Sequence, residues 1–157
     1  MSPELEEIVA LAVAVVLGGI VGLEREINGK PAGIRTNILI CLGAAAFTVV
    51  SKHLGTDYGT GTGRMAAGIV AGVGFLGAGA LIQEGSGVHG LTTAASIWLV
   101  ASIGIACGVG LYRLAVVVTL LALLVLFGLL PLTRRIRRKN GRADNTPQRR
   151  STDLHNQ

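Results

Sequence analysis

The chain has 157 residues, of which 50% are hydrophobic and 15% charged, whereas an average soluble domain carries about 25% charged residues. Its net charge of +5 arises at one end, because residues 133–157 hold eight Lys/Arg and two Asp/Glu, while residues 1–132 hold six and seven. These values exclude a disordered body, which would need low hydrophobicity, and a basic nucleic-acid-binding surface on that body.

Five apolar runs follow one another along the chain, separated by short polar connections. Each run is close to the roughly 20 residues that cross a bilayer as a helix. The 23 glycines suit such helices, because small residues let helices approach closely in lipid. The sequence therefore predicts an all-α, polytopic membrane bundle of five helices within a single domain, residues 1–132. The expected helices cover residues 5–23, 34–50, 65–82, 91–111 and 114–132.

The first connection, "LEREINGKPAGIRTN", places several charges directly after an apolar run. We expect Glu24 to face the bundle, with Arg25 and Glu26 at the interface. If the turn is helical, Glu24 and Glu26 point to different sides and cannot chelate one Mg²⁺ together. Two interpretations stay open: a structural ion pair between Glu24 and Arg35, or contact with an ion or a partner.

Glycines four residues apart recur in the first, third and fourth runs, so each pair lies on one helix face. We interpret them as helix-packing positions, with a flexible gate as the alternative. The stretch "GVGFLG" resembles a nucleotide-binding fingerprint, but no strand precedes it, and nucleotide binding is rejected. The packing glycines are Gly18, Gly22, Gly68, Gly72, Gly77, Gly104 and Gly108.

The second polar connection leads into the fourth run through "QEGSGVHGLTTAASIW". Its threonines either cap the free N–H groups of the helix or line a polar mouth together with the charged groups. Trp98 lies too deep for an interfacial anchor, so it packs inside the bundle or against lipid. The candidate residues of the charged mouth are Glu24, Arg25, Glu26, Arg35, Thr36, Glu84, His89, Thr92 and Thr93.

Orientation follows from the distribution of Lys and Arg, which favour the cytoplasmic side. With the C-terminus inside, eleven Lys/Arg lie inside and three outside, so we expect an N-out, C-in topology. Residues 133–157 are expected to form a disordered basic tail in the cytoplasm. No nucleophile–base pair or metal-ligand spacing is present in the sequence, so neither an enzyme nor a cofactor is expected, and Cys41 and Cys107 are assigned to packing.

The stretches "GGIVGLEREINGKPAGIRTN", "GVGFLGAGALI" and "VHGLTTAASIWLVASIGIACGVGLY" together resemble the MgtC/SapB family of bacterial membrane proteins. The resemblance implies a multi-pass inner-membrane protein linked to growth under magnesium limitation and, in pathogens, to survival in host cells. Family members were once taken for magnesium transporters, and control of the rotary ATP synthase is another action suggested for them.

Two features depart from the family. Longer members carry a soluble C-terminal sensing domain where this chain has its basic tail. Arg is expected where His89 stands, and some members have Asn in place of Thr92. We therefore expect a non-enzymatic regulator that acts through helix contacts with another membrane protein or with further copies of itself. A transporter or channel for magnesium or another small solute is the alternative, and a purely structural membrane protein is a third hypothesis.

Overall fold

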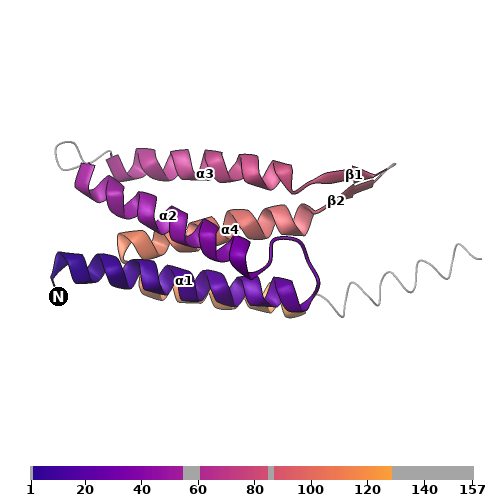
Figure 1. Ribbon diagram of the computed structural model, residues 1–157, viewed down its shortest axis with the longest axis horizontal. Coiled ribbons are helices and arrows are strands. Elements are labelled where there is room, and N and C mark those ends of the chain that lie inside the picture. Colours follow the sequence, from indigo (N-terminus) through magenta and orange to yellow (C-terminus); the bar gives the residue numbers. More distant parts are fainter. Residues whose placement is uncertain (1, 55–60, 85–86, 129–157) are drawn as a thin grey trace, which may run out of the picture. The chain divides into compact units, whose positions relative to one another are not determined.

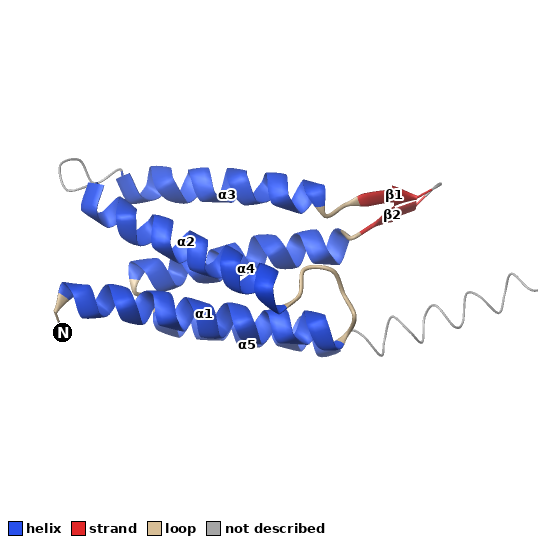
Figure 2. Cartoon of the chain, viewed as in Figure 1, coloured by secondary structure: helices blue, strands red, loops and turns tan. Residues whose placement is uncertain are grey.

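The computed structural model describes residues 2–54, 61–84 and 87–128, and the predicted tail, 133–157, lies outside these ranges. The five predicted helices are present in the described residues (Figure 1). Two short antiparallel strands lie between the third and fourth helices (Figure 2). The elements are α1 (Pro3–Ile27), α2 (Ile34–Leu54), α3 (Gly61–Gly79), β1 (Ile82–Glu84), β2 (Gly87–His89), α4 (Leu91–Val109) and α5 (Tyr112–Gly128).

Length and composition make three of the described helices, α1, α2 and α4, long and apolar enough to cross a membrane. The apolar part of α3 and the whole of α5 are shorter. The contacts between residues divide the chain into two parts, residues 1–123 and 124–157. Of the second part, the structure describes only the last residues of α5. The first part, described below, carries the helix packing.

The first helix is longer than the hydropathy of its sequence predicts, because it continues through the charged residues to Ile27. Pro3 starts it with a preset backbone angle, and Glu4 and Glu6 in its first turn suit the positive end of the helix dipole. Its last turn is closed by the backbone N–H of Asn28, which bonds to the carbonyl oxygen of Glu24. Glu24, Arg25 and Glu26 are therefore part of α1 and not of a loop.

The third helix ends earlier than predicted, at Gly79, and the expected turn after it contains a β-hairpin. Ile82 pairs with His89, Gln83 with Val88, and Glu84 with Gly87. This pairing satisfies backbone N–H and C=O groups of the two strands, which no helix satisfies. Gly90 then starts α4 with a φ of +92°, an angle that glycine adopts without strain.

The second helix lies between α1 and α4, and glycines on both neighbours make the close approach. A Cβ at Gly18 would stand 2.7 Å from Cys41 Cβ, and one at Gly108 would stand 2.5 Å from Thr48 Cβ. A Cβ at Gly104 would collide with the carbonyl oxygen of Cys41, and one at Gly22 would stand 2.6 Å from Ile34 Cα. Such contacts replace the hydrophobic drive that is absent between helices in lipid.

The third helix has a looser fit than the other neighbours of α2. Ile69 and Val73 join Ala44, Ile97 and Ala101 in a buried cluster between α2, α3 and α4. A Cβ at Gly77 would make ordinary contact with Ala94, 3.6 Å from its carbonyl oxygen. In contrast with the expected packing role, a Cβ at Gly68 or Gly72 would meet no atom within 4 Å.

Large apolar side chains cover the outer faces of the helices, as they would in contact with lipid. Phe75 is 82% exposed, and Trp98 is 53% exposed and therefore lies against the outside of the bundle. In α5, Ala115, Thr119 and Ala122 form one buried stripe, and most of its leucines and valines are exposed. A surface of this kind favours lipid over water as the solvent of the helices.

Candidate functional site: a buried polar cluster

Buried polar side chains gather at the end of the bundle where α1 ends and both α2 and α4 begin. We call this set the polar cluster; its members are Glu24, Arg25, Asn28, Asn37 and Thr93. Glu24, Arg25, Asn37 and Thr93 are each at most 3% exposed, and Asn28 is half-buried. Because buried charges are costly unless they are paired or hydrogen-bonded, the bonds that these groups make define the site.

Arg25 connects α1 to α4 across a wide sequence separation. Its Nη2 donates a hydrogen bond to Thr93 Oγ1 at 3.0 Å, and both side chains are buried. The expectation that Arg25 lies at the interface is therefore wrong. The capping interpretation of the threonines is also wrong, because α4 has Gly90 as its N-cap residue and no side-chain cap bond, and Thr92 is exposed.

Glu24 is buried as expected, but its partner is an asparagine. Asn28 Nδ2 donates to Glu24 Oε1 at 2.8 Å and to the Glu24 carbonyl oxygen at 3.0 Å. The proposed ion pair with Arg35 does not form, since Arg35 is exposed on α2 and no such contact is present. The contact that the described residues do make between a carboxylate and a basic side chain joins Glu7 to His53, at the opposite end of the bundle.

The turn from α1 to α2 is held by two side chains. Glu26 Oε2 accepts the backbone N–H of Ile34 at 3.0 Å, so Glu26 caps a helix that follows its own. Asn37 Nδ2 donates to the carbonyl oxygens of Ala32 and Gly33. Ala32 has a φ of +58°, in the left-handed region that side chains rarely adopt, and the Asn37 bond holds it there.

Most of the other residues predicted for a charged mouth do not join the buried polar cluster. Arg35, Thr36, His89 and Thr92 are exposed, Glu84 lies in β1, and only Thr93 joins the α1 residues. The sequence reasoning missed Asn28 and Asn37. The signal for Asn37 was available: a lone amide at the start of an apolar run must find hydrogen-bond partners inside the bundle.

Three buried side-chain atoms of the polar cluster have no hydrogen-bond partner: Glu24 Oε2, Arg25 Nε and Asn37 Oδ1. Among the described residues, no group of three or more His, Cys, Asp or Glu is placed to hold a metal ion. The two orphan oxygens are therefore not part of a dense carboxylate site, and a water or a single cation would match each of them chemically.

Four of the buried hydroxyl groups in the described helices donate hydrogen bonds within their own helices. Thr48 donates to the carbonyl oxygen of Ala44, Ser51 to Thr48, and Ser96 to Thr93, all at 2.7–2.8 Å. Thr119 in α5 does the same with Ala115. These four hydroxyl groups thus bond to the backbone of their own helices and do not form a row of free donors across the bundle, whereas Thr93 accepts from Arg25 of another helix.

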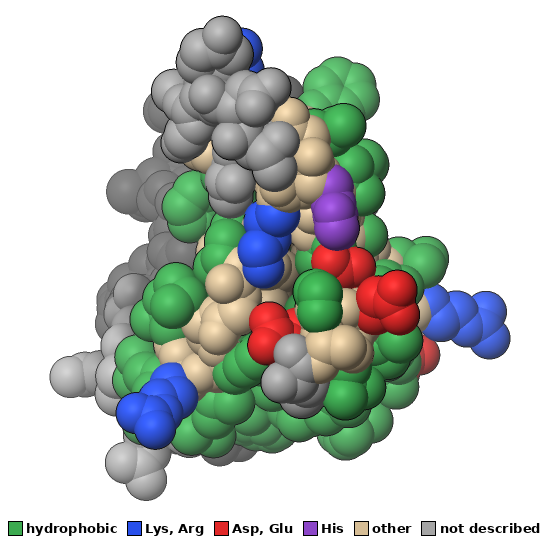
Figure 3. All heavy atoms as spheres, turned by 90° about the vertical axis from the view of Figure 1, so that its left-hand side faces the viewer, with side chains coloured by type: hydrophobic (Ala, Val, Ile, Leu, Met, Phe, Trp, Pro, Cys, Tyr) green, Lys and Arg blue, Asp and Glu red, His purple; other side chains and the backbone are tan. Residues whose placement is uncertain are grey.

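Charged groups also border the other end of the bundle, where α1 begins. His53 Nε2 lies 2.6 Å from Glu7 Oε1, and Lys52 Nζ donates to the Gly108 carbonyl oxygen at 3.3 Å. Tyr112 Oη donates to the Glu6 carbonyl oxygen at 3.3 Å. Figure 3 looks onto this end and shows acidic, basic and histidine side chains beside one another, flanked by hydrophobic ones.

Helices with apolar outer faces and charged groups gathered at both ends define an α-helical membrane protein. The MgtC family matches residues 11–135, which is most of the sequence, so the chain belongs to this family. The match confirms the resemblance that the three sequence stretches indicated.

Three relatives illustrate the similarity. YhiD of Escherichia coli K12, by name a candidate magnesium transporter, is 43% identical over 141 residues, 86% of this chain and 66% of YhiD. MgtC of Brucella abortus strain 2308 is 45% identical over 124 residues, 79% of this chain and 51% of that protein. MgtC of Salmonella typhimurium LT2 is 44% identical over 116 residues, 74% of this chain and 49% of that protein. The chain thus spans two thirds to one half of these relatives' lengths, and no solved structure matches it.

Proposed function

We propose that this member of the MgtC family is a non-enzymatic regulator in the bacterial inner membrane. It works by helix contacts with a partner membrane complex and serves growth when magnesium is scarce. In this proposal the chain crosses the membrane several times, with its N-terminus outside and its C-terminus inside. The family membership and the names of the relatives support the link to magnesium.

The regulator proposal rests on the hydrogen bonds that the buried hydroxyl groups of the bundle make. The buried hydroxyl groups of Thr48, Ser51 and Ser96 donate to carbonyl oxygens of their own helices. Ionisable or polar groups inside the spanning segments are what mark a pathway for ions or polar solutes. In the polar cluster, Arg25 and Thr93 bond to each other at one end of the bundle. The outer surface of the bundle is therefore the part that is free to contact another molecule.

The outer face of α3 is well suited to receive another helix. Ala67, Ala71, Gly74 and Ala78 follow one another at helical spacing, and all four are exposed. Small residues at this spacing allow two backbones to approach closely in lipid. This face lies on the side of α3 that the bundle leaves uncovered, so a partner helix is able to dock there without rearrangement.

Photo-crosslinking in native membranes tests this proposal. A photoreactive residue at Ala71, on the outer face of α3, is expected to capture a discrete partner. The same residue at Leu120, an exposed position on α5, serves as the matched control for general lipid-facing proximity. Recovery of no species other than the chain itself, from Ala71 and in low-magnesium medium, would remove the regulator proposal.

A transporter or channel for magnesium or another small solute is the second candidate. The unpartnered buried oxygens Glu24 Oε2 and Asn37 Oδ1 favour it, because hard cations prefer oxygen ligands. Purified protein in liposomes decides the matter by magnesium flux. A flux that Glu24→Gln abolishes and Glu26→Gln preserves would replace the regulator by a transporter; the regulator proposal expects no flux from either variant or from the unmodified chain.

A growth assay connects either candidate to physiology. A deletion strain complemented with the unmodified chain is expected to grow at low magnesium concentration, and the Glu24→Gln and Arg35→Gln variants separate the buried residue from the exposed one. Wild-type growth with both variants would favour a purely structural role, provided that both proteins accumulate normally in the membrane.

A further inference from the structure

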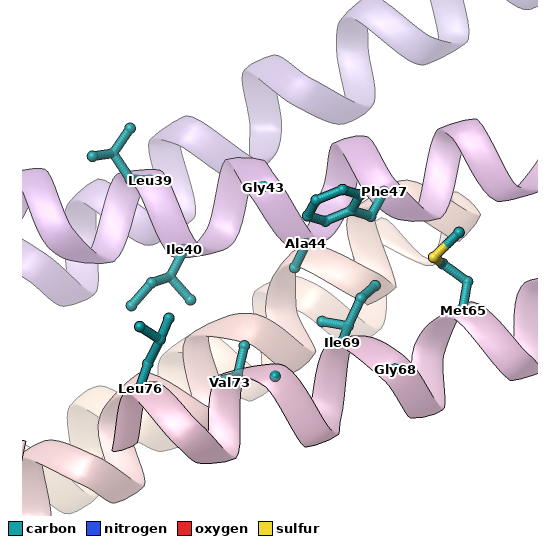
Figure 4. A pocket seen from close by; sticks show the side chains of 11 residues that line it. Leu39, Ile40, Gly43, Ala44, Phe47, Met65, Gly68, Ile69, Val73 and Leu76 are labelled. Atoms are coloured by element: carbon teal, nitrogen blue, oxygen red, sulfur yellow. The ribbon is translucent and has the colours of Figure 1, made fainter. Parts of the chain in front are cut away.

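An open groove lies between α2 and α3, on the side of the bundle away from α1. It has a volume of about 490 Å³, within the range of small-molecule sites. Figure 4 shows Ile40 of α2 and Leu76 of α3 pointing toward each other near one end, with Phe47 and Met65 at the other. The lining is almost wholly apolar, so the groove fits a hydrocarbon occupant.

The floor of the groove is unusually free of side chains. A Cβ at Gly43, Gly68 or Gly72 would meet no atom within 4 Å, so these glycines keep open a space that larger residues would fill. An empty slot is unfavourable, because the atoms that line it lose their van der Waals contacts. The shape therefore calls for a narrow, flexible occupant.

An arginine stands at one mouth of the groove. Arg64, Gly68, Gly72 and Leu76 follow at intervals of four, so they share one face of α3. Arg64 is exposed, and its neighbour Met65 lines the groove. Arg35 precedes Leu39 in the same way on α2, but beside it Glu26 already places a carboxylate on the backbone of Ile34. The Arg64 mouth is the one that better attracts an anion.

From Met65 to Leu76 the groove follows α3 for about 16 Å at 1.5 Å per residue, roughly the depth of one bilayer leaflet. We propose that this groove binds an anionic phospholipid, with one acyl chain lying along Gly68 and Gly72 and the phosphate bound by the Arg64 guanidinium. The charge at the mouth and the length of the slot favour a lipid over a helix of a second copy. This inference goes beyond the regulator proposal and does not depend on it.

Native mass spectrometry of the purified full chain tests the proposal. The protein is titrated with phosphatidylglycerol and with phosphatidylcholine of the same acyl chains. We expect phosphatidylglycerol to bind more tightly, and Gly68→Leu to lower the affinity for both lipids about tenfold by filling the slot. Gly74→Leu, on the outer face of the same helix where a Cβ also meets no atom, is the matched control and keeps wild-type affinity.

The headgroup contact is tested separately from the slot. Arg64→Gln is expected to lower phosphatidylglycerol affinity about fivefold, since one cation near anionic lipid contributes about that factor. Phosphatidylcholine affinity is expected to fall less, because the choline cation offsets the charge of the phosphate that Arg64 binds. Arg35→Gln is the matched control at the other end. If Arg35→Gln removes the preference and Arg64→Gln does not, the assignment of the mouth is overturned.

Two results would overturn the groove as a lipid site. One is wild-type lipid affinity in both Gly68→Leu and Gly43→Leu, which fill the slot from opposite walls. The other is a change in the ratio of monomer to dimer in these variants with lipid binding unaltered, which would make a second copy the occupant. Helical circular dichroism spectra that match the unmodified chain ensure that both variants are folded. The same variants are also crosslinked from Ala71. If they lose lipid binding but still capture the partner, the lipid site and the regulator proposal are independent of each other.

Discussion

Arg25 and Glu24 are adjacent in sequence and both buried, yet they bond in different directions. Arg25 reaches across to Thr93 of α4, whereas Glu24 is held by Asn28 within its own helix end. Neighbouring opposite charges lower the cost of burying either one. Removing a single hydrogen-bond partner, however, leaves a buried polar group unsatisfied, which costs more than the bond itself contributes.

The Arg25–Thr93 bond leads to a prediction at the residue scale. Thr93→Val keeps the shape of the side chain but removes the acceptor, so we expect the free energy of unfolding to fall by about 1–3 kcal/mol. Denaturation in mixed detergent and dodecyl sulfate micelles measures it. Thr92→Val changes the same residue type at an exposed neighbouring position and is expected to have almost no effect. Equal effects at both positions would contradict an energetic role for the bond.

Glu26 allows a second prediction, about a charge with a structural role. Its carboxylate accepts the N–H of Ile34 and so caps α2. Glu26→Ala removes this acceptor and is expected to lower the free energy of unfolding by about 1 kcal/mol, whereas Glu26→Gln keeps an acceptor oxygen and costs less. The same micelle denaturation compares the two variants. If Gln costs as much as Ala, the negative charge and not the hydrogen bond is what matters at this turn.

At the scale of elements, the order of the helices and their approximate bounds were predictable, because an apolar run of sufficient length has no stable alternative to a helix in lipid. The extension of α1 to Ile27 was not predictable from hydropathy, because the apolar run ends before Glu24. The helical backbone hydrogen bonds nevertheless continue as far as Asn28. The hairpin was not predicted either, because its strands have only three residues each.

The polar cluster was only partly predictable, for a reason that concerns distance along the chain. The burial of Glu24 could be expected from helical spacing, because that spacing depends only on neighbouring residues in the chain. The burial of Arg25 depends on Thr93, which lies 68 residues away, and no local pattern contains that contact. The Glu24–Arg35 pairing failed because the sequence places two charges near one turn without saying which side of α2 Arg35 occupies.

Glycine spacing also needs the fold for its interpretation. The same four-residue interval gives tight contact at Gly104 and open space at Gly68. Gly104→Ala is therefore expected to lower the free energy of unfolding by about 1–3 kcal/mol through collision with the backbone of α2. Gly68→Ala is expected to leave it unchanged or to raise it by up to about 1 kcal/mol, because alanine restricts the unfolded chain. The reverse order in micelle denaturation would contradict the packing of α2 between α1 and α4.

At the scale of the whole molecule, the connections alternate between the two ends of the bundle. The bond between Arg25 and Thr93 brings the ends of α1 and the start of α4 together, and the contacts of His53 with Glu7 and of Tyr112 with Glu6 identify the opposite end. Lys30 therefore lies at the end of the polar cluster, and Arg113 lies at the other. The distribution of positive charge then predicts which end faces the cytoplasm.

Cysteine labelling in a bacterial host tests this orientation with little background, because Cys41 and Cys107 are both fully buried. An impermeant maleimide applied to intact cells is expected to modify Arg113→Cys and to spare Lys30→Cys, and both react once the membrane is broken. Each variant removes one of the six positive charges in residues 1–132, so the bias that sets the topology is largely preserved. Labelling of Lys30→Cys in intact cells would reverse the orientation and would place the polar cluster, with the unpartnered oxygen of Glu24, on the outside of the membrane. Labelling of both positions in intact cells would mean that the connection between α1 and α2 and the one between α4 and α5 share a side, and no bundle with the contacts of Arg25 and His53 meets that condition.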